Sequence, residues 1–175
     1  METVIQLNSE AKLSPHLASP SVAALSNLSE LNCVRLSPHF TLGELTKTSH
    51  KVYNIPSHEA IENLKRLCPL LEALRERAGT PIIINSGYRS PQLNRKVGGS
   101  PTSNHLTGCA VDIRVKDNEQ LIMYAAILIQ YANETHQDFD ELLLEKNRHG
   151  AIWLHFAVKP SGNRRHVLFL TSPTV

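Results

Sequence analysis

The stretch SGYRSPQLNRKVGGSPTSNHLTGCAVDI, residues 86–113, concentrates glycine, serine, asparagine, histidine and aspartate between two segments with strand character. The apolar run PIIIN precedes it, and its end continues into CAVDIRV, where apolar and polar residues alternate. This alternation predicts a strand with one apolar face and with Asp112 pointing away from the core. His105 lies in the loop before that strand, and Gly108 allows the backbone to turn. The stretch therefore predicts that the side chains of His105 and Asp112 converge on one point.

Helix signals flank this stretch on both sides. Before it, Thr41 can cap a short helix, and apolar residues at three- and four-residue intervals predict a second helix from about Ser57 to Ala78, kinked at Pro69. Within it, Ser90 can cap a short helix that ends at the following glycines. After it, a further amphipathic helix is expected from about Asp117.

Three segments with strand character end the chain: ELLLE at 141–145, GAIWLHFAV at 150–158 and HVLFLT at 166–171. Only a few polar residues separate the first two, which predicts a hairpin. Together with the helices, they predict an α+β fold in which a mainly antiparallel sheet packs with helices.

The length and composition predict one domain. A chain of 175 residues with 41% hydrophobic residues can bury a substantial core, which we expect over residues 38–175. Residues 1–37 are rich in Ser, Leu, Asn and Pro and show no sustained periodicity. We therefore expect them to form a weakly structured N-terminal extension.

Charge and hydropathy exclude several classes of function. The formal charge of +2 comes from scattered Lys and Arg without interleaved aromatic residues, which argues against a nucleic-acid partner. No apolar run approaches the roughly eighteen residues that a membrane span needs. The first residues lack the basic region and apolar core of a secretory signal, so we expect a cytoplasmic location before any release. Nothing in the sequence requires more than a monomer.

A metal site built from nitrogen and oxygen ligands is the main chemical hypothesis. The three cysteines show no CxxC spacing, so a thiolate site is not indicated. An imidazole from His105 and a carboxylate from Asp112 suit zinc, but a catalytic zinc usually has three protein ligands. His155, inside the apolar segment AIWLHFAV, is one candidate for the third ligand. The alternative is a buried core histidine with ordinary hydrogen bonds.

The chain resembles the M15-type zinc peptidases, which include D-alanyl-D-alanine carboxypeptidases and phage L-alanyl-D-glutamate endolysins. Their pattern SxHxxGxAxD, followed later by a WxH strand, is present here as SNHLTGCAVD and WLH, with the upstream motifs SGYRSP and FTLGEL. The resemblance spans residues 40–158. It implies a hedgehog/DD-peptidase-like fold, Zn²⁺ held by His105, Asp112 and His155, and peptidoglycan stem peptides as substrate.

The general base is harder to assign. Several members of the family carry an acidic residue three positions before the last ligand, where this chain has Ile152. Glu145 is the first substitute: with a turn over about 146–150 it would lie opposite Ala151 and share a face with His155. The alternative for Glu145 is a solvated residue at a strand end. His149, in the turn, is a second candidate for the base or for the acid that protonates the leaving amine.

Other residues are candidates for substrate binding. Arg89 resembles the family arginine that faces substrate and could stabilise a developing oxyanion, or it could brace the loop through a salt bridge. Ser103 could hydrogen-bond the substrate or hold the loop through local backbone bonds. Trp153 is expected to form a wall of the site.

These residues favour a zinc-dependent peptidase that cuts an amide bond of the stem peptide, either as a D-Ala-D-Ala carboxypeptidase or as an L-Ala-D-Glu endopeptidase. The alternative is a zinc-stabilised domain that binds the cell wall or a partner and has lost catalysis, to which Ile152 points. A wall substrate and the absence of a visible export signal would be reconciled in a phage or prophage lysin.

Overall fold

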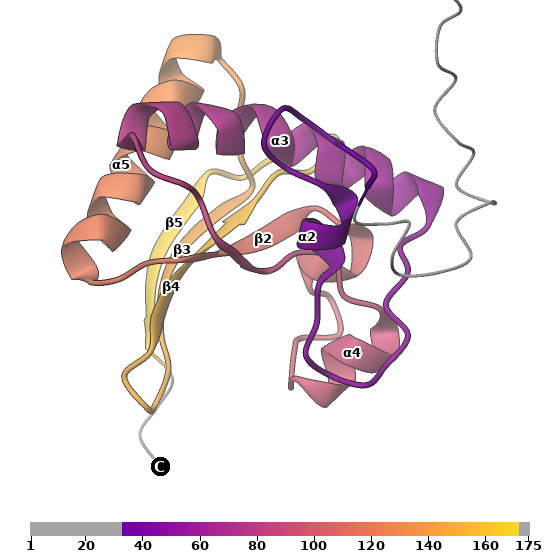
Figure 1. Cartoon of the computed structure of the whole chain (residues 1–175). Coiled ribbons are helices and arrows are strands. Elements are labelled where there is room, and N and C mark those ends of the chain that lie inside the picture. The colour runs from indigo at the N-terminus through magenta and orange to yellow at the C-terminus, as the bar shows by residue number, and fades with distance from the viewer. Residues whose placement is uncertain (1–32, 172–175) are drawn as a thin grey trace, which may run out of the picture.

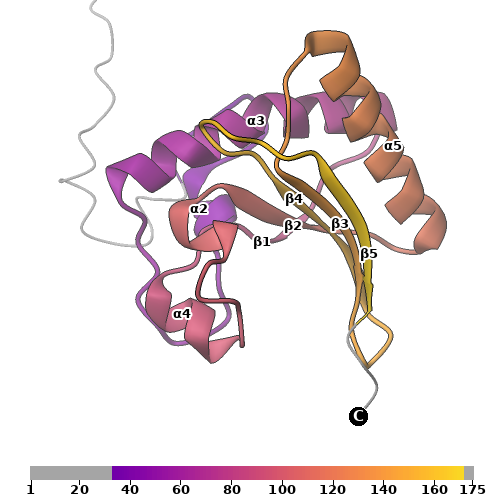
Figure 2. The same cartoon turned by 180° about the vertical axis from the view of Figure 1, so that it is seen from behind.

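The computed structural model describes residues 33–171 and shows an α+β fold, with long helices packed across one face of a curved five-stranded sheet (Figures 1 and 2). The order of the strands is β1-β2-β4-β3-β5. All neighbours are antiparallel except β3 and β5, which are parallel. The strands are β1 Ile84–Ser86, β2 Ala110–Arg114, β3 Glu141–Lys146, β4 Ile152–Ala157 and β5 His166–Thr171. The predicted fold class is confirmed.

The helices begin where the sequence places capping residues. They are α2 Leu42–Thr46, α3 His58–Ala78, α4 Pro91–Lys96, the short 3₁₀ helix η2 Asn104–Thr107, and α5 Asn118–Thr135. The side chains of Thr41, Ser57, Ser90 and Asp117 each accept a hydrogen bond from a backbone N–H of the first turn. Pro69 lies inside α3 without ending it, and the helix stops at Gly79, whose φ is 64°.

The core lies between the sheet and the helices α3 and α5. Its largest fully buried side chains include Tyr124 of α5, Phe156 of β4 and Phe139, which precedes β3. Among the residues that the structure describes, no helix is long and apolar enough to cross a membrane. The alternating face of β2 is also confirmed, since Val111 and Ile113 belong to this core.

The described part of the chain includes the last few residues of the predicted extension. Residues 1–32 lie outside the described part of the chain. Val34 and Leu36, however, pack against the core, and the carbonyl of Val34 accepts a 2.8 Å hydrogen bond from the amide of Leu42. These two residues therefore contact the folded domain.

The predicted hairpin of β3 and β4 is present, but its register differs by two residues. Glu145 pairs with Trp153 and not with Ala151. The physical reason is the turn, in which the Asn147 side chain accepts hydrogen bonds from the amides of His149 and Ala151 at 2.9 Å each. A shift of two residues keeps every side chain on its predicted face of the sheet.

Candidate metal centre

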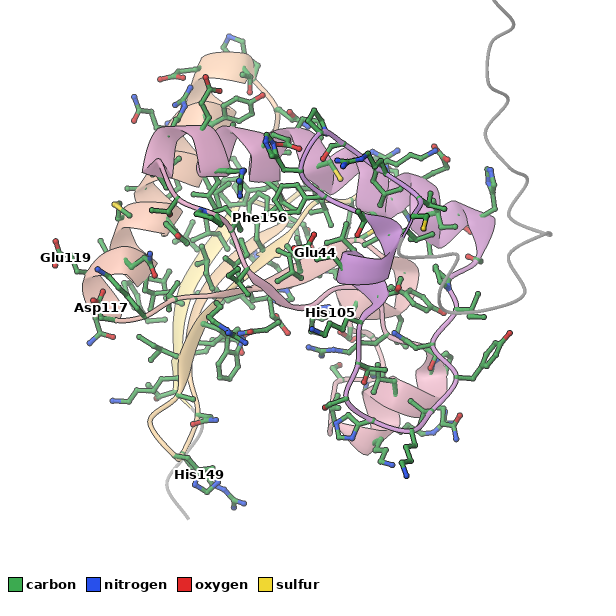
Figure 3. The ribbon with its side chains drawn as sticks, viewed as in Figure 1. Glu44, His105, Asp117, Glu119, His149 and Phe156 are labelled. Carbon is green, nitrogen blue, oxygen red and sulfur yellow. The ribbon has the colours of Figure 1, made fainter. Side chains whose placement is uncertain are left out.

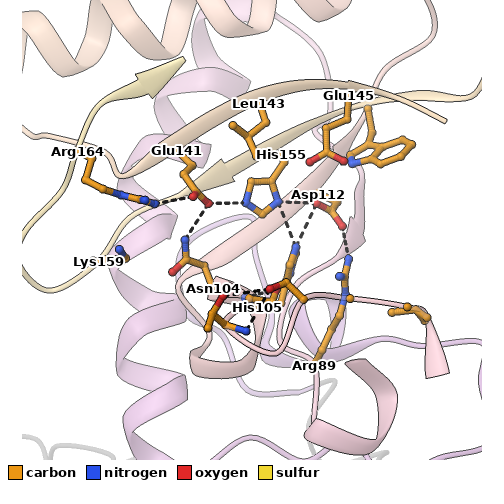
Figure 4. A pocket seen from close by; sticks show the side chains of 17 residues that line it. Arg89, Asn104, His105, Asp112, Glu141, Leu143, Glu145, His155, Lys159 and Arg164 are labelled. Atoms are coloured by element: carbon orange, nitrogen blue, oxygen red, sulfur yellow. Dashed lines mark hydrogen bonds and ion pairs between the residues drawn. The ribbon is translucent and has the colours of Figure 1, made fainter. Parts of the chain in front are cut away.

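Three elements bring His105, Asp112 and His155 together on the open face of the sheet (Figure 4). Figure 3 shows where His105 lies in the whole fold. Asp112 of β2 and His155 of β4 are direct partners in the antiparallel register. His105 belongs to η2, which ends at Gly108 with φ 72°, and this turn leads the chain directly into β2. All three side chains are buried, although Asp112 was expected only to point away from the core. Asp112 is buried because η2 covers the centre of the sheet there.

The hydrogen-bond partners orient the two imidazole rings. Nδ1 of His105 lies 2.6 Å from the carbonyl oxygen of Gly87, which can only accept, so this nitrogen carries the proton. Nε2 of His155 faces the carboxylate of Glu141 at 3.5 Å. The other ring nitrogen of each histidine is therefore turned toward Asp112.

These two nitrogens and one carboxylate oxygen meet at a single point. Nε2 of His105 lies 3.2 Å from Nδ1 of His155 and 3.2 Å from Oδ1 of Asp112, and Nδ1 of His155 lies 2.9 Å from that oxygen. Three ligands on a tetrahedron with zinc bonds of about 2.0–2.1 Å would be roughly 3.3 Å apart. The donor set and its spacing thus fit zinc.

The pKa shifts of the clustered residues also favour a positive charge between them. Burial opposes the ionisation of Asp112, but the two histidines outweigh it and hold the pKa of Asp112 far below its usual range. Burial lowers the pKa of His105. Burial also disfavours the charged form of His155, but hydrogen bonds to Asp112 and Glu141 prevail and raise its pKa to about 9. At neutral pH a positive charge, as a proton or a bound cation, is therefore favoured between these atoms.

The loop before η2 is held against α2 by close backbone contact. The amide of Tyr88 donates to the carbonyl of Leu45 at 2.8 Å, and a Cβ atom on Gly87 would lie 2.2 Å from the same oxygen. Only glycine fits this approach, and the adjacent carbonyl of Gly87 is the one that orients His105. Ser103 accepts a hydrogen bond from the amide of His105, so it makes the local backbone bond predicted as one of its two roles.

Arg89 contacts the cluster through the carboxylate oxygen of Asp112 that does not face the histidines. Its Nη2 donates to Oδ2 of Asp112, and its Nε donates to Ser86 at 2.8 Å. The second carboxylate oxygen of Asp112 is thereby held, which leaves Oδ1 to face the histidines. Arg89 also lines the cleft, so the salt bridge predicted as one of its two roles is made by a side chain that borders the cavity.

A cleft of about 700 Å³ opens over the three residues. Ser103, Glu145 and Trp153 line it, together with Arg89. Glu145 lies on the same face of the hairpin as His155, because Leu143 is the direct partner of His155 and Glu145 that of Trp153. Burial raises the pKa of Glu145, and the field of His155 only partly offsets this. The predicted substitute for the base is thus brought to the site.

His149 is not brought to the cleft. It is an exposed residue of the turn between β3 and β4, and Figure 3 shows it at the tip of the hairpin, far from His105. Its ring accepts a hydrogen bond from Nε of Arg148 at 3.1 Å. The sequence interpretation of His149 as an acid or base is therefore not supported by its position, because the hairpin extends beyond the sheet.

A polar cluster on the far side of His155 was missed from the sequence. Asn104, Glu141, Lys159 and Arg164 all line the cleft there. Glu141 could have been found, because it has the same parity on its strand as Glu145 and so must share its face. The others follow from loop conformations that carry no sequence signal of this kind.

Comparison with known proteins gives a family match and a structural resemblance. The family Peptidase M15 matches residues 38–149, which is more than half of the chain and includes His105, Asp112 and Glu145. Among solved structures, the chain resembles the L-Ala D-Glu endopeptidase ChiX of Serratia marcescens, with 19% identity and a TM-score of 0.39 over 58% of this chain and 87% of that one. The search of curated proteins found no match. On the family match, the chain belongs to the Peptidase M15 family.

Proposed function

We propose that this protein is a zinc-dependent peptidase that hydrolyses an amide bond in the stem peptide of peptidoglycan. The observation that carries the proposal is the convergence of two imidazole nitrogens and one carboxylate oxygen at the floor of an open cleft, with Glu145 beside them. Membership of the Peptidase M15 family supports hydrolysis of peptides. The wall substrate is what the sequence motifs of the family imply.

His105, Asp112 and His155 would hold the ion, which when bound would polarise the scissile carbonyl and lower the pKa of a water molecule. Glu145 would accept a proton from the attacking water and deliver it to the leaving amine. The raised pKa of Glu145 suits the role of base, since a carboxylate with a higher pKa accepts a proton from water more readily.

The cleft walls would place the substrate. Arg89 would face the carbonyl oxygen as negative charge develops on it, while its bond to Asp112 keeps the guanidinium in place. Trp153 would form an apolar wall beside Glu145. Ser103, which already holds η2, would offer its hydroxyl to the peptide backbone of the substrate.

Both a D-Ala-D-Ala carboxypeptidase and an L-Ala-D-Glu endopeptidase are consistent with this arrangement. We propose that a monomer acts at the cell wall after release from the cytoplasm, as a phage or prophage lysin would.

A zinc-stabilised binding domain without catalysis is the second candidate, to which Ile152 points in the sequence. Ile152 packs against the core, because a residue three positions before His155 lies on the opposite face of a regular strand. An acid at this position would therefore not face the cleft in this fold. Glu145, on the correct face, favours catalysis.

Digestion of purified muropeptides tests the proposal. The protein would be incubated with added zinc, without it, and with a chelator, and the products read by mass spectrometry. A chelator-sensitive loss of D-alanine would identify a carboxypeptidase, and a cut after L-alanine an endopeptidase. Tight zinc binding without any product from several wall chemotypes would favour the binding domain instead.

A further inference from the structure

We propose that Glu141 is a positioning residue that holds the imidazole of His155 in the orientation needed to bind the metal. This inference rests on the metal-dependent function proposed above and extends it to a residue outside the ligand set. Of the three clustered residues, Glu141 pairs with His155, and it acts through that residue.

The geometry of the hairpin brings the two residues together. Glu141 of β3 pairs with Ala157 of β4, so it is the diagonal neighbour of His155 on the same face of the sheet. Its Oε2 lies 3.5 Å from Nε2 of His155, an ion-pair contact at the outer limit of a hydrogen bond (Figure 4). Nδ1 of the same ring lies 2.9 Å from Asp112. The imidazole is thus placed between two carboxylates, one on each nitrogen.

The carboxylate of Glu141 is itself fixed. Its Oε1 accepts a hydrogen bond from Nη2 of Arg164 at 2.5 Å, and its Oε2 accepts one from Nδ2 of Asn104 at 2.9 Å. Arg164 is anchored in turn by two 2.7 Å hydrogen bonds to Asp140, whose side chain is fully buried. A carboxylate held in this way presents an acceptor in a defined direction.

Asn104 links this arrangement to the second histidine. It precedes His105 in η2, and its amide contacts both Glu141 and Asp140. Glu141 therefore contacts the ring of one proposed ligand and the neighbouring residue of another. Partners of this kind fix the tautomer of a ligating histidine, and their loss lowers metal affinity by about 10- to 100-fold in known sites.

Zinc affinity, measured by competition with a chromogenic chelator, tests the inference in the full-length protein. Glu141→Gln removes the charge but keeps an oxygen acceptor, whereas Glu141→Leu removes both at similar volume. We expect Glu141→Leu to weaken zinc binding by about 10- to 100-fold and Glu141→Gln to weaken it by a clearly smaller factor. Equal losses in both variants would assign the effect to charge alone and overturn the positioning role. Unchanged affinity in Glu141→Leu would also overturn it.

A second measurement covers the case in which Glu141→Leu fails to fold. Long-range ¹H–¹⁵N correlation spectra of the zinc-loaded wild type should show His155 protonated at Nε2, and a proton at Nδ1 would contradict the inference. Arg164→Leu, at a half-exposed side chain, should weaken zinc binding in the same direction as Glu141→Leu but less. If the wild type itself binds no zinc, the proposed metal site fails and the role of Glu141 with it. If the wild type binds zinc and the variants bind it with the same affinity, the metal site stands and only the proposed role of Glu141 is wrong.

Discussion

Asp112 and His155 face each other across the pairing of β2 with β4, and Oδ1 of Asp112 lies 2.9 Å from Nδ1 of His155. Two of the three proposed ligands are therefore fixed by backbone pairing at the centre of the sheet. The third, His105, comes from η2, which the turn at Gly108 and the contact of Gly87 with Leu45 hold in place. The site combines two rigid strand positions with one loop position, so its sensitivity to substitution should differ between them.

Substitution of the shared carboxylate should remove tight metal binding. In Asp112→Asn, the amide has the same shape but no charge, so it is a poor zinc ligand and no longer attracts the two histidines. We expect zinc affinity to fall by more than about 100-fold, since changes outside the ligand set already cost about 10- to 100-fold. Equilibrium dialysis followed by metal analysis would measure it. Asp138→Asn, at an exposed aspartate that pairs with Arg165, is the control and should bind zinc as the wild type does.

Glu145→Gln should separate metal binding from turnover. Glu145 lines the cleft but is not part of the three-residue cluster, so zinc should stay bound while hydrolysis of muropeptides falls by about 100- to 10,000-fold. In the wild type, Glu145 must be ionised to accept a proton, and burial raises its pKa above the usual 4.5. The activity should therefore decline as the pH falls through a value above 4.5.

The control for this variant is Glu119→Gln, at an exposed position in the first turn of α5, which Figure 3 shows well away from His105. It should retain wild-type activity. Full activity in Glu145→Gln would show that Glu145 is not the base.

Much of the fold could be predicted because its signals are local. Capping residues such as Ser57 and Asp117 mark helix starts through hydrogen bonds within one turn, and the alternation in β2 specifies its faces. The convergence of His105 and Asp112 followed from their spacing around Gly108. His155 was chosen through the resemblance to a known family, because its place beside Asp112 depends on the pairing of strands distant in sequence.

The parts that could not be predicted depend either on the conformation of a turn or on contacts between distant segments. The hairpin register is determined by the side chain of Asn147, and a register two residues away has the same hydrophobic pattern. Without this register, the position of His149 relative to the cleft could not be predicted. The roles of Asn104 and Arg164 depend on loops that meet only in the folded chain.

Gly87→Ala should weaken both the fold and the metal site. The added Cβ would lie 2.2 Å from the carbonyl oxygen of Leu45, so the loop must move away from α2. The movement would displace the Gly87 carbonyl that accepts from Nδ1 of His105. We expect a loss of about 1–3 kcal/mol in the free energy of unfolding, measured with urea, and weaker zinc binding.

A glycine elsewhere provides the comparison. Gly150 has a φ of 86°, and a Cβ atom added there would have no neighbour within 4 Å, so Gly150→Ala introduces backbone strain alone. It should cost about 1 kcal/mol and leave zinc affinity unchanged. Equal zinc affinity in the two alanine variants would contradict the role of Gly87 in holding His105.

Asp140 should make the stability of the protein depend on pH in the acid range. Its fully buried carboxylate accepts hydrogen bonds from Arg164 and Asn104 and pairs with Lys159 at 3.0 Å. Burial opposes its ionisation, but these partners prevail and hold its pKa well below the usual 3.8. Because the pKa is lower in the folded state, the stabilisation is complete above the unfolded pKa of about 3.9 and is lost progressively below it.

Asp140→Asn should therefore destabilise the protein by about 3 kcal/mol at pH 7, since it leaves the Arg164 and Lys159 charges without their shared partner. The difference from the wild type should persist down to about pH 5 and narrow below about pH 4, where the wild-type carboxylate begins to lose its advantage. Urea unfolding at a series of pH values would measure it. The exposed pair of Asp138 with Arg165 is the internal comparison, because Asp138→Asn should change stability by less than about 1 kcal/mol. A constant difference between Asp140→Asn and the wild type from pH 7 to pH 3 would show that the stabilisation does not come from the ionised carboxylate.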